Sequence, residues 1–296
     1  MNNNNWRLSV YFNPDCIPCV INQALRAAKL FTNGNKNLQL KILKEVCEEV
    51  KIINEVFTAP HFSAVIQEIV EKNVKNENLY KELKEKNIKI VEQFLPLLQK
   101  KMEDAEDKLE ESIKIAILGN TIDVGANPNF DIRDEIENYT SEDYSPVNIE
   151  QLKNSLRNAG SILYIGDNYE EALFDKFLLK ELDEKDVTFA VRSKPILNDI
   201  TYDDAVKLGI DKISKVIESG SRIGGTDLNY CTKEFIEKFN SADVVISKGQ
   251  GNYETLLDEA RPIYFLFKVK CEAIAERSKS PIGSSVIYYN NSTAQN

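Results

Sequence analysis

The sequence predicts an α/β protein in which a helical N-terminal region precedes a mostly parallel sheet. In the first third of the chain, apolar residues recur at spacings of three and four, as on one face of an amphipathic helix. Beyond residue 110, short apolar runs alternate with helical stretches, and this alternation is typical of parallel sheets covered by helices. We therefore expect a helical subdomain over residues 1–110 and an α/β core over residues 111–296.

The helical region is predicted to begin with two helices. Asp15 can cap the first helix, and Pro18 is tolerated in its first turn. The second is predicted from Asn37 to Phe57, with the apolar residues Leu40, Leu43, Val46, Cys47, Val50, Ile53 and Phe57. The charged segment from Tyr80 to Glu110 again has a helical period, and its Lys and Glu clusters predict a solvated helix face.

Short apolar runs predict the strands of the sheet. These runs are Ile113–Leu118, Ile162–Ile165, Val187–Val191, Val244–Ile246 and Ile263–Phe267. Helical stretches lie between them, such as Glu171–Leu182 and Lys233–Phe239. The acidic segment from Phe130 to Ser145 is predicted to be a loop or surface insertion. The Ser- and Asn-rich tail after Ser278 is predicted to fray.

Composition and charge exclude several classes of function. The formal net charge of −10 argues against a nucleic-acid partner, which would require clustered Lys and Arg. No apolar stretch approaches the ~20 residues that span a bilayer, and no secretory signal is visible, so we expect a soluble, cytoplasmic protein. The five cysteines, an odd number, fit a reducing compartment. His61 is the sole histidine, which excludes metal motifs that need two histidines.

Polar residues follow several predicted strands, at the sheet edge where ligands of open α/β sheets bind. Asp167 and Asn168 follow the second strand and offer hard oxygen ligands suited to Mg²⁺ or Mn²⁺. Asp199 could bring another carboxylate to the same edge. The alternative is structural. Taken alone, the first pair favours an Asx turn or a helix N-cap, and Asp199 could cap the helix that follows it.

A glycine-rich turn, Ser247-Lys248-Gly249-Gln250-Gly251-Asn252, follows the fourth strand. Its glycines permit unusual backbone angles, and its backbone N–H groups can form an anion-binding nest. Lys248 supplies a point charge for a phosphate. The alternative is a tight strand-to-helix turn with an exposed lysine. The turn matches neither a Walker loop nor the dinucleotide-binding fingerprint.

Asn120, Asp123 and Arg192 are further candidates for substrate binding. Asn120 and Asp123 could hydrogen-bond a substrate, or could only stabilise a turn, and are less suited to a metal. Arg192 could hold a phosphate or carboxylate in a bidentate fork, or could form a structural ion pair.

Cys16 and Cys19 form a Cys-x-x-Cys motif, which suggests redox chemistry or half of a zinc site. No second close cysteine pair is present, so two semi-buried thiols at a helix start are the favoured interpretation. His61 follows Pro60 and is predicted to lie in a loop or at a helix start.

Taken together, these motifs resemble the domain-of-unknown-function 89 family, the damage-control phosphatases. The matching motifs are Asp15-Cys16-Ile17-Pro18-Cys19, Gly119-Asn120-Thr121-Ile122-Asp123, Gly166-Asp167-Asn168 with Glu171, Lys194-Pro195-Ile196-Leu197-Asn198-Asp199 and Ser247-Lys248-Gly249-Gln250-Gly251-Asn252-Tyr253-Glu254. They span nearly the whole chain, and the N-terminal cysteine pair resembles the subgroup common in archaea and bacteria. The resemblance implies a three-layer α/β/α core with a helical N-terminal subdomain.

The resemblance also implies a metal-dependent phosphatase that acts on small phosphorylated metabolites such as sugar phosphates. Asp167, Asn168 and Asp199 would hold one divalent cation, which could be Mn, Ni, Co or Mg. Lys248 would bind the substrate phosphate, and Asp167, Asn168 and Lys248 would be the catalytic residues. The attacking group would be a water or a carboxylate such as Asp167. The remaining residues of the substrate pocket would be Asn120, Asp123, Arg192, Gly249 and Asn252.

One position departs from the family pattern. Glu170 stands where the family often has glycine, just before the residue that matches Glu171. The extra carboxylate could tune the affinity for a metal or could face solvent.

Two other functions stay open at this stage. One is an S-adenosylmethionine-dependent protein carboxyl methyltransferase, although the sequence lacks a glycine-rich nucleotide loop of the usual kind. The other is a non-catalytic protein that binds a metal or a metabolite.

Overall fold

A computed structural model describes residues 12–53, 57–120 and 147–290, and it confirms the predicted mixed α/β fold. The sheet has six strands in the order β3-β2-β1-β4-β5-β6. The first five are parallel, and β6 is antiparallel to β5. The strands are β1 (Ser161–Ile165), β2 (Asp186–Val191), β3 (Lys215–Glu218), β4 (Val244–Lys248), β5 (Ile263–Lys268) and β6 (Ser285–Asn290).

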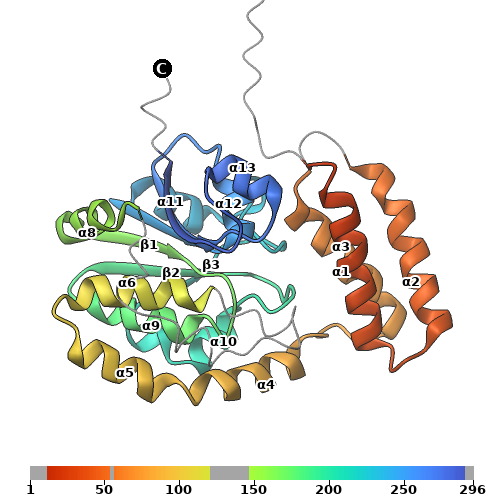
Figure 1. The fold of residues 1–296 in the computed structure, drawn as a ribbon, viewed down its shortest axis with the longest axis horizontal. Coiled ribbons are helices and arrows are strands. Elements are labelled where there is room, and N and C mark those ends of the chain that lie inside the picture. Colours follow the sequence, from red (N-terminus) through yellow and green to blue (C-terminus); the bar gives the residue numbers. More distant parts are fainter. Residues whose placement is uncertain (1–11, 54–56, 121–146, 291–296) are drawn as a thin grey trace, which may run out of the picture.

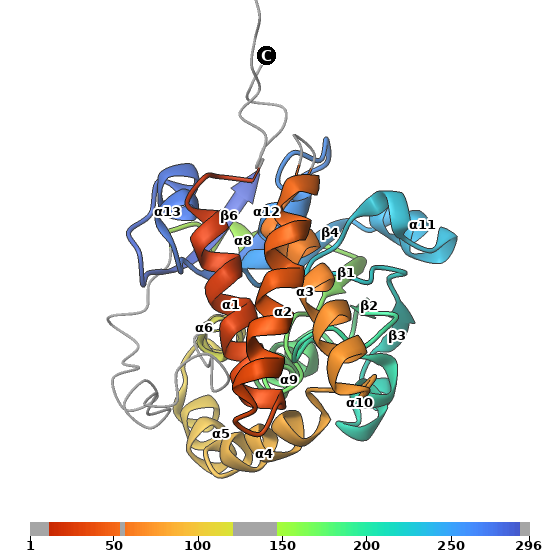
Figure 2. The ribbon, with the colours of Figure 1, turned by 90° about the vertical axis from the view of Figure 1, so that its right-hand side faces the viewer.

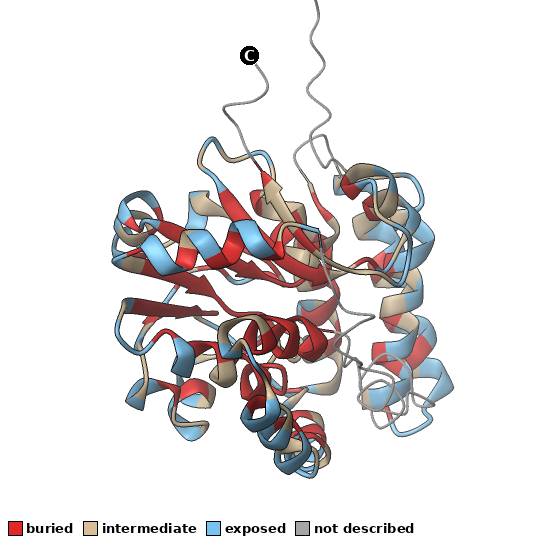
Figure 3. Ribbon diagram, turned by 60° about the vertical axis from the view of Figure 1, so that its left-hand side comes forward, coloured by how far each residue is buried: buried red, intermediate tan, exposed pale blue. Residues whose placement is uncertain are grey.

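Helices cover both faces of the sheet (Figure 1). One face packs against α6 (Lys108–Gly119), α8 (Ile149–Asn158), α9 (Ala172–Glu181) and α10 (Tyr202–Lys207). The other packs against α11 (Lys233–Ser241), α12 (Gln250–Leu256) and α13 (Glu272–Ser278). The residues of β1 alternate between the two apolar clusters: Ile162 and Tyr164 join the first, and Leu163 and Ile165 join the second. The central strands β1, β2, β4 and β5 are therefore mostly buried, as Figure 3 shows, and the core has three layers.

The N-terminal helices stand to one side of the α/β core in Figure 1 and in front of it in Figure 2. They are α1 (Cys16–Phe31), α2 (Lys36–Glu49) and α3 (Ala59–Val74), and they form an apolar cluster of their own. The next two helices, α4 (Lys81–Glu92) and α5 (Leu95–Asp104), instead contribute side chains to the cluster of the α/β core. The predicted division of the chain at residue 110 stays a prediction.

The prediction of a strand at Ile113–Leu118 is wrong. These residues belong to α6, in which every residue from Glu111 to Gly119 is buried. A helix that is buried on all sides loses the polar positions that reveal its period, so its short apolar run cannot be told from a strand.

The predicted fraying after Ser278 is also wrong, because residues Ser285–Asn290 form strand β6. The Ser- and Asn-rich residues that suggested fraying flank this strand, whose own residues Val286, Ile287, Tyr288 and Tyr289 pack against the two apolar clusters. The sequence pattern also missed the short edge strand β3 at the opposite side of the sheet. Edge strands bury fewer residues, so their apolar signal is weak.

Other helix predictions hold with shifted ends. The second predicted helix ends at Glu49 and continues only as a short 3-10 helix, Val50–Ile52. Asp15 occupies the N-cap position of α1, but within the described residues its side chain makes no capping bond. The segment Phe130–Ser145 lies outside the described residues. In the described ranges, no helix is both long enough and apolar enough to cross a bilayer.

Candidate active site

The topology brings the polar residues at the ends of three strands together. Asp167 and Asn168 follow β1, Arg192 follows β2, and Lys248 ends β4. Because β2, β1 and β4 are neighbouring parallel strands, their carboxyl ends meet at one edge of the sheet. This edge is where the sequence predicted the site.

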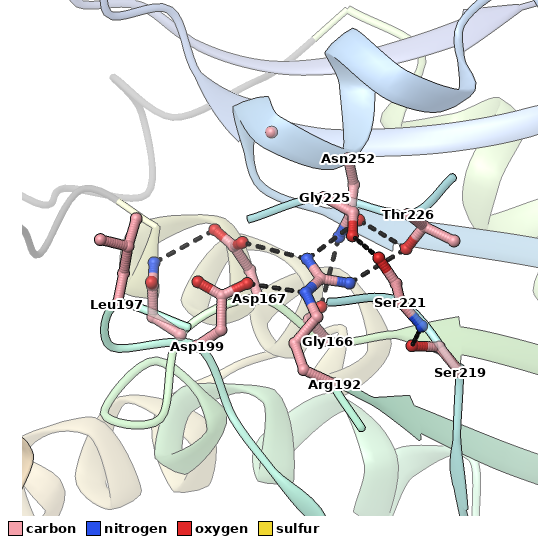
Figure 4. Close-up of polar contacts among 12 residues, drawn as sticks. Gly166, Asp167, Arg192, Leu197, Asp199, Ser219, Ser221, Gly225, Thr226 and Asn252 are labelled. Carbon is pink, nitrogen blue, oxygen red and sulfur yellow. Dashed lines mark hydrogen bonds and ion pairs between the residues drawn. The ribbon is translucent and has the colours of Figure 1, made fainter. Parts of the chain in front are cut away.

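Asp167 and Asp199 face the same guanidinium group (Figure 4). The Nε of Arg192 donates to the Oδ2 of Asp199 at 2.7 Å, and its Nη2 lies 3.8 Å from the Oδ1 of Asp167. Arg192 is 1% exposed, so this ion pair is shielded from water. These contacts match the alternative of a structural ion pair, and substrate binding by Arg192 stays a prediction.

The backbone locks the two acidic segments against each other. The Ile200 N–H donates to the carbonyl oxygen of Asp167, and the Tyr169 N–H donates to that of Asn198, both at 2.8 Å. Asp199 does not cap α10; Thr201 does so, in a capping box with Asp204. Helix α9 has Glu171 at its N-cap position. The structure therefore removes the capping interpretations that competed with a ligand role for Asp167, Asn168 and Asp199.

Asn252 and Thr226 fix the orientation of Arg192. The Nη1 of Arg192 donates to the Thr226 hydroxyl, and its Nη2 donates to the Oδ1 of Asn252, both at 3.0 Å. The Nδ2 of Asn252 donates to the carbonyl oxygens of Lys248 at 2.7 Å and Gly166 at 3.2 Å. Asn252 is fully buried, and the hydrogen bonds of its side chain connect the glycine-rich turn to the guanidinium group of Arg192.

Gly249 allows the glycine-rich turn to approach Asp167. Its φ is +81°, and a Cβ atom at this position would lie 1.9 Å from the Oδ2 of Asp167. No other residue type combines that backbone angle with so close an approach. Gly251 is constrained in a similar way, since a Cβ there would lie 1.9 Å from the carbonyl oxygen of Gly224.

Lys248 is not the exposed lysine of the structural alternative, because its side chain is fully buried. Its ammonium group donates to the carbonyl oxygen of Ala116 at 2.8 Å and to Asp175 at 2.6 Å. It also pairs with Glu171. Three acceptors thus already surround the three N–H donors of this ammonium. A contact between Lys248 and a phosphate stays a prediction.

Asn120 joins the site from the end of α6. Its Nδ2 donates to Glu171 at 2.9 Å and to Asp167 at 3.2 Å. Its Oδ1 accepts a hydrogen bond from the Lys268 N–H at 2.9 Å. Asp123, the other candidate of this motif, lies outside the described residues.

The site brings several buried carboxyl groups together. Burial raises the pKa of Asp167 well above its ordinary value, the charges of Asp199 and Glu171 raise it further, and Arg192 and Lys270 lower it. Burial also raises the pKa of Asp199, although the charge of Arg192 opposes this. Carboxylates that resist ionisation in this way favour the approach of a positive charge.

The donors at this edge fit a divalent cation that prefers oxygen ligands. Asp167 and Asp199 offer carboxylate oxygens, and Asn168 offers an amide oxygen beside them. Within the described ranges, no three His, Cys, Asp or Glu side chains form a group that could hold a metal by themselves. A cation here would therefore need the amide of Asn168 as well as the two carboxylates.

Sequence reasoning missed several residues of the site. Asp175 lies one helical turn after Glu171, and this spacing on the apolar face of α9 was a usable signal for a buried acidic pair. Thr226 lies in a loop without a recognisable motif. Lys270 is exposed, and its charge reaches Asp167 from the segment after β5.

The solvated face predicted for Tyr80–Glu110 is wrong in part. Lys84 and Asn87 of α4 are buried and point toward the site. The Nζ of Lys84 donates to the carbonyl oxygen of Asp199 at 2.6 Å. The Nδ2 of Asn87 donates to Glu170 at 2.9 Å. Polar residues on a charged helix can face inward when polar groups of another segment hydrogen-bond to them. Only the tertiary structure shows which segment supplies those groups.

Glu170, the departure from the family pattern, does not face solvent. Its side chain is fully buried and accepts hydrogen bonds from Asn87 and from Asn198 at 3.1 Å. Burial raises the pKa of Glu170. This carboxylate therefore ties α4 to the loop that carries Asp199.

The cysteine pair and His61 were the two other sequence candidates. All five cysteines are free thiols, and Cys16 and Cys19 lie in the first turn of α1 as predicted, but only Cys16 is partly buried and Cys19 is exposed. His61 lies in the first turn of α3, where its Nδ1 contacts the Thr58 hydroxyl at 2.8 Å. Its Nε2 lies 2.9 Å from Asp227, which links α3 to the loop beside Thr226.

The chain is similar to several known proteins along almost its whole length. A family model described as the damage-control phosphatase ARMT1-like domain matches residues 12–286. The chain is 36% identical over 292 residues to an uncharacterized protein of Methanocaldococcus jannaschii, covering 94% of this chain and 95% of the relative. It is 32% identical over 283 residues to a damage-control phosphatase of Pyrococcus horikoshii, covering 93% and 97%. The crystal structure of a DUF89 family protein from Pyrococcus horikoshii matches with a TM-score of 0.84 and 31% identity, covering 94% and 99%.

Proposed function

The chain belongs to the damage-control phosphatase ARMT1-like domain family, and from this premise we propose that it is a metal-dependent phosphatase of small phosphorylated metabolites. The observation that carries the proposal is the convergence of Asp167, Asn168 and Asp199 at the end of β1 beside Gly249. Relatives with the name damage-control phosphatase support the reaction class.

Asp167, Asn168 and Asp199 would hold one divalent cation, of which Mn, Ni, Co and Mg are the candidates. Such a cation would neutralise charge on the phosphoryl group and polarise it. Arg192 would not contact the substrate in this arrangement, because Asp199, Thr226 and Asn252 occupy its donors. Its role is to hold Asp199 and Asp167 in place.

Lys270 is the cation that we propose for the substrate phosphate. It is exposed, and its charge lowers the pKa of Asp167. A lysine ammonium group can bind a phosphate as a point charge. Lys248 would reach a phosphate only by leaving Glu171 or Asp175, so its main role in this proposal is to neutralise those two carboxylates.

The attacking group is a water molecule or the carboxylate of Asp167. A carboxylate route would leave a phosphoryl group on Asp167, which hydroxylamine would trap after acid quenching. A water route would leave no trapped species. Asn120 and Asn168 both donate to Asp167 and Glu171, so they set the position of these carboxylates toward the substrate.

The test is an assay of phosphate release from an aryl phosphate and a panel of sugar phosphates, with each candidate cation added to chelator-stripped protein. We expect metal-dependent release that falls by at least about 100-fold in Asp167→Asn, the range for removing one electrostatic group from a site. Asp183→Asn, which removes an exposed carboxylate, is the matched control and should leave release unchanged. Folded protein that releases no phosphate with any cation would refute the proposal, and tight binding of S-adenosylmethionine would then favour a methyltransferase.

A further inference from the structure

The loop that carries Asp199 contains a turn with an unfavourable residue. The Asp199 N–H donates to the carbonyl oxygen of Ile196 at 3.0 Å, which closes a turn with Leu197 in its second position. The φ of Leu197 is +46°. Turns with a positive φ at this position are dominated by Gly, Asn and Asp, because a Cβ atom crowds the backbone there. Leu197 holds this conformation only if the surrounding structure stabilises it.

Gln67 of helix α3 supplies that stabilisation from 130 residues away. Its Oε1 accepts a hydrogen bond from the Leu197 N–H at 2.7 Å, and its Nε2 donates to the carbonyl oxygen of Pro195 at 3.0 Å. The Nε2 also donates to Glu71 at 2.7 Å, which fixes the orientation of the amide. Gln67 is 6% exposed, so water does not compete well for these bonds.

The turn then determines where the carboxylate of Asp199 lies. Only one residue separates Leu197 from Asp199, whose Oδ2 accepts the 2.7 Å hydrogen bond from Arg192 (Figure 4). Lys84 of α4 holds the carbonyl oxygen of Asp199 at 2.6 Å. The backbone of this segment is thus held at its start by α3 and at its end by α4.

We propose that Gln67 is a positioning residue for the cation site: its amide holds the Leu197 turn in the conformation that brings Asp199 to Asp167 and Asn168. The inference rests on the proposed function, because it assigns Asp199 as a ligand of the cation. It adds a role for α3, alongside the contact that Lys84 of α4 makes with the backbone of Asp199. Replacing a residue that orients a metal ligand through hydrogen bonds typically weakens metal binding by ~10- to 100-fold.

A purely structural role for Gln67 would predict a different pattern. If Gln67 only anchored α3, its loss would lower the stability of the protein without any special effect on cation binding. A second substitution separates the two roles. Leu197→Gly removes the unfavourable Cβ, so glycine would adopt the turn without help from Gln67.

The experiment uses full-length protein stripped of metal with a chelator. The variants are Gln67→Met, Leu197→Gly and the double variant of the two. Gln39→Met is the matched control, because Gln39 is also a helical glutamine with 6% exposure, and its amide donates to Thr32, at the end of α1. The readouts are the dissociation constant for Mn²⁺ by calorimetry and the hydrogen exchange of the peptide over residues 195–200.

We expect Gln67→Met to weaken Mn²⁺ binding by ~10- to 100-fold and to speed exchange in residues 195–200. Adding Leu197→Gly should restore most of the lost affinity, and Gln39→Met should leave the affinity unchanged. Wild-type Mn²⁺ affinity in Gln67→Met, or no recovery of affinity in the double variant, would overturn the role of Gln67 and leave the proposed function untouched. Unsubstituted protein that binds none of the four candidate cations would refute the proposed function and this inference with it.

Discussion

Replacing Lys248 by methionine tests whether this lysine is primarily a buried counter-charge. Its ammonium group faces Glu171 and Asp175, and all three side chains are at most 1% exposed. Methionine keeps most of the apolar stem, so the substitution removes a charge with little change in volume. Two buried carboxylates would then lack their shared cation.

Removing one partner of a buried ion pair destabilises a protein by about 3–5 kcal/mol, because the remaining charge is left without compensation. For a chain of this size, about 2–4 °C of melting temperature correspond to 1 kcal/mol, so the midpoint should fall by on the order of 10 °C. The control is Lys233→Met, whose side chain is 92% exposed. It should change the midpoint little, since exposed ion pairs contribute at most ~1 kcal/mol.

The destabilisation by Lys248→Met should depend on pH, and the pKa of Asp175 determines in which direction. Burial raises the pKa of Asp175 from 3.8 to about 6 even though Lys248 lowers it, so losing Lys248 must raise it further. Below that pKa the folded protein can protonate Asp175 and escape the uncompensated charge, whereas at higher pH it cannot. The destabilisation of Lys248→Met should therefore be larger at pH 8 than at pH 5.

Chemical unfolding of both proteins at the two pH values measures this difference. A destabilisation below about 1 kcal/mol that is equal at pH 5 and pH 8 would refute the ion-pair argument. Loss of phosphate release in such a stable variant would then point to direct contact between Lys248 and the substrate.

Two further predictions concern the glycine-rich segment. Gly249→Ala should abolish cation binding in a protein that still folds, because a Cβ there would lie 1.9 Å from the Oδ2 of Asp167 and φ is +81°. Calorimetry with Mn²⁺ measures this loss. The control is Gly34→Ala, because the φ of Gly34 is also +81° but a Cβ there would meet nothing within 4 Å. Burial raises the pKa of Glu254 from 4.5 to about 7, despite a hydrogen bond from Gln250. The folded state then binds this proton more tightly than the unfolded state, so the stability that Glu254 contributes is present below pH 4.5 and is lost as pH rises toward 7. Glu254→Gln should raise the melting temperature more at pH 8 than at pH 5, and an equal change at both values would contradict the argument.

The sequence alone was sufficient for the class of the fold, and it indicated which strand ends contribute to the candidate site. Asp167, Asn168 and Arg192 follow buried strands, and strand ends of a parallel sheet share one edge regardless of how the rest of the chain packs. Gly249 was also visible, because a glycine in a short strand-to-helix turn signals an unusual backbone angle. These inferences depend on local pattern and on topology, both of which can be read along the chain.

Other features required the folded chain. The apolar run of α6 resembled a strand because burial on all sides removes the helical period. The glutamine that holds the Leu197 turn and the lysine that holds Asp199 lie on helices more than 100 residues earlier in the chain.

The sequence by itself determined which residues could form a site, because residue chemistry and strand ends are local properties. Only the tertiary structure decided their roles: Lys248 is buried between Glu171 and Asp175, and Arg192 is held by Asp199, Thr226 and Asn252. The physical reason is that a charged side chain takes its role from its partners and its burial, and distant segments supply both.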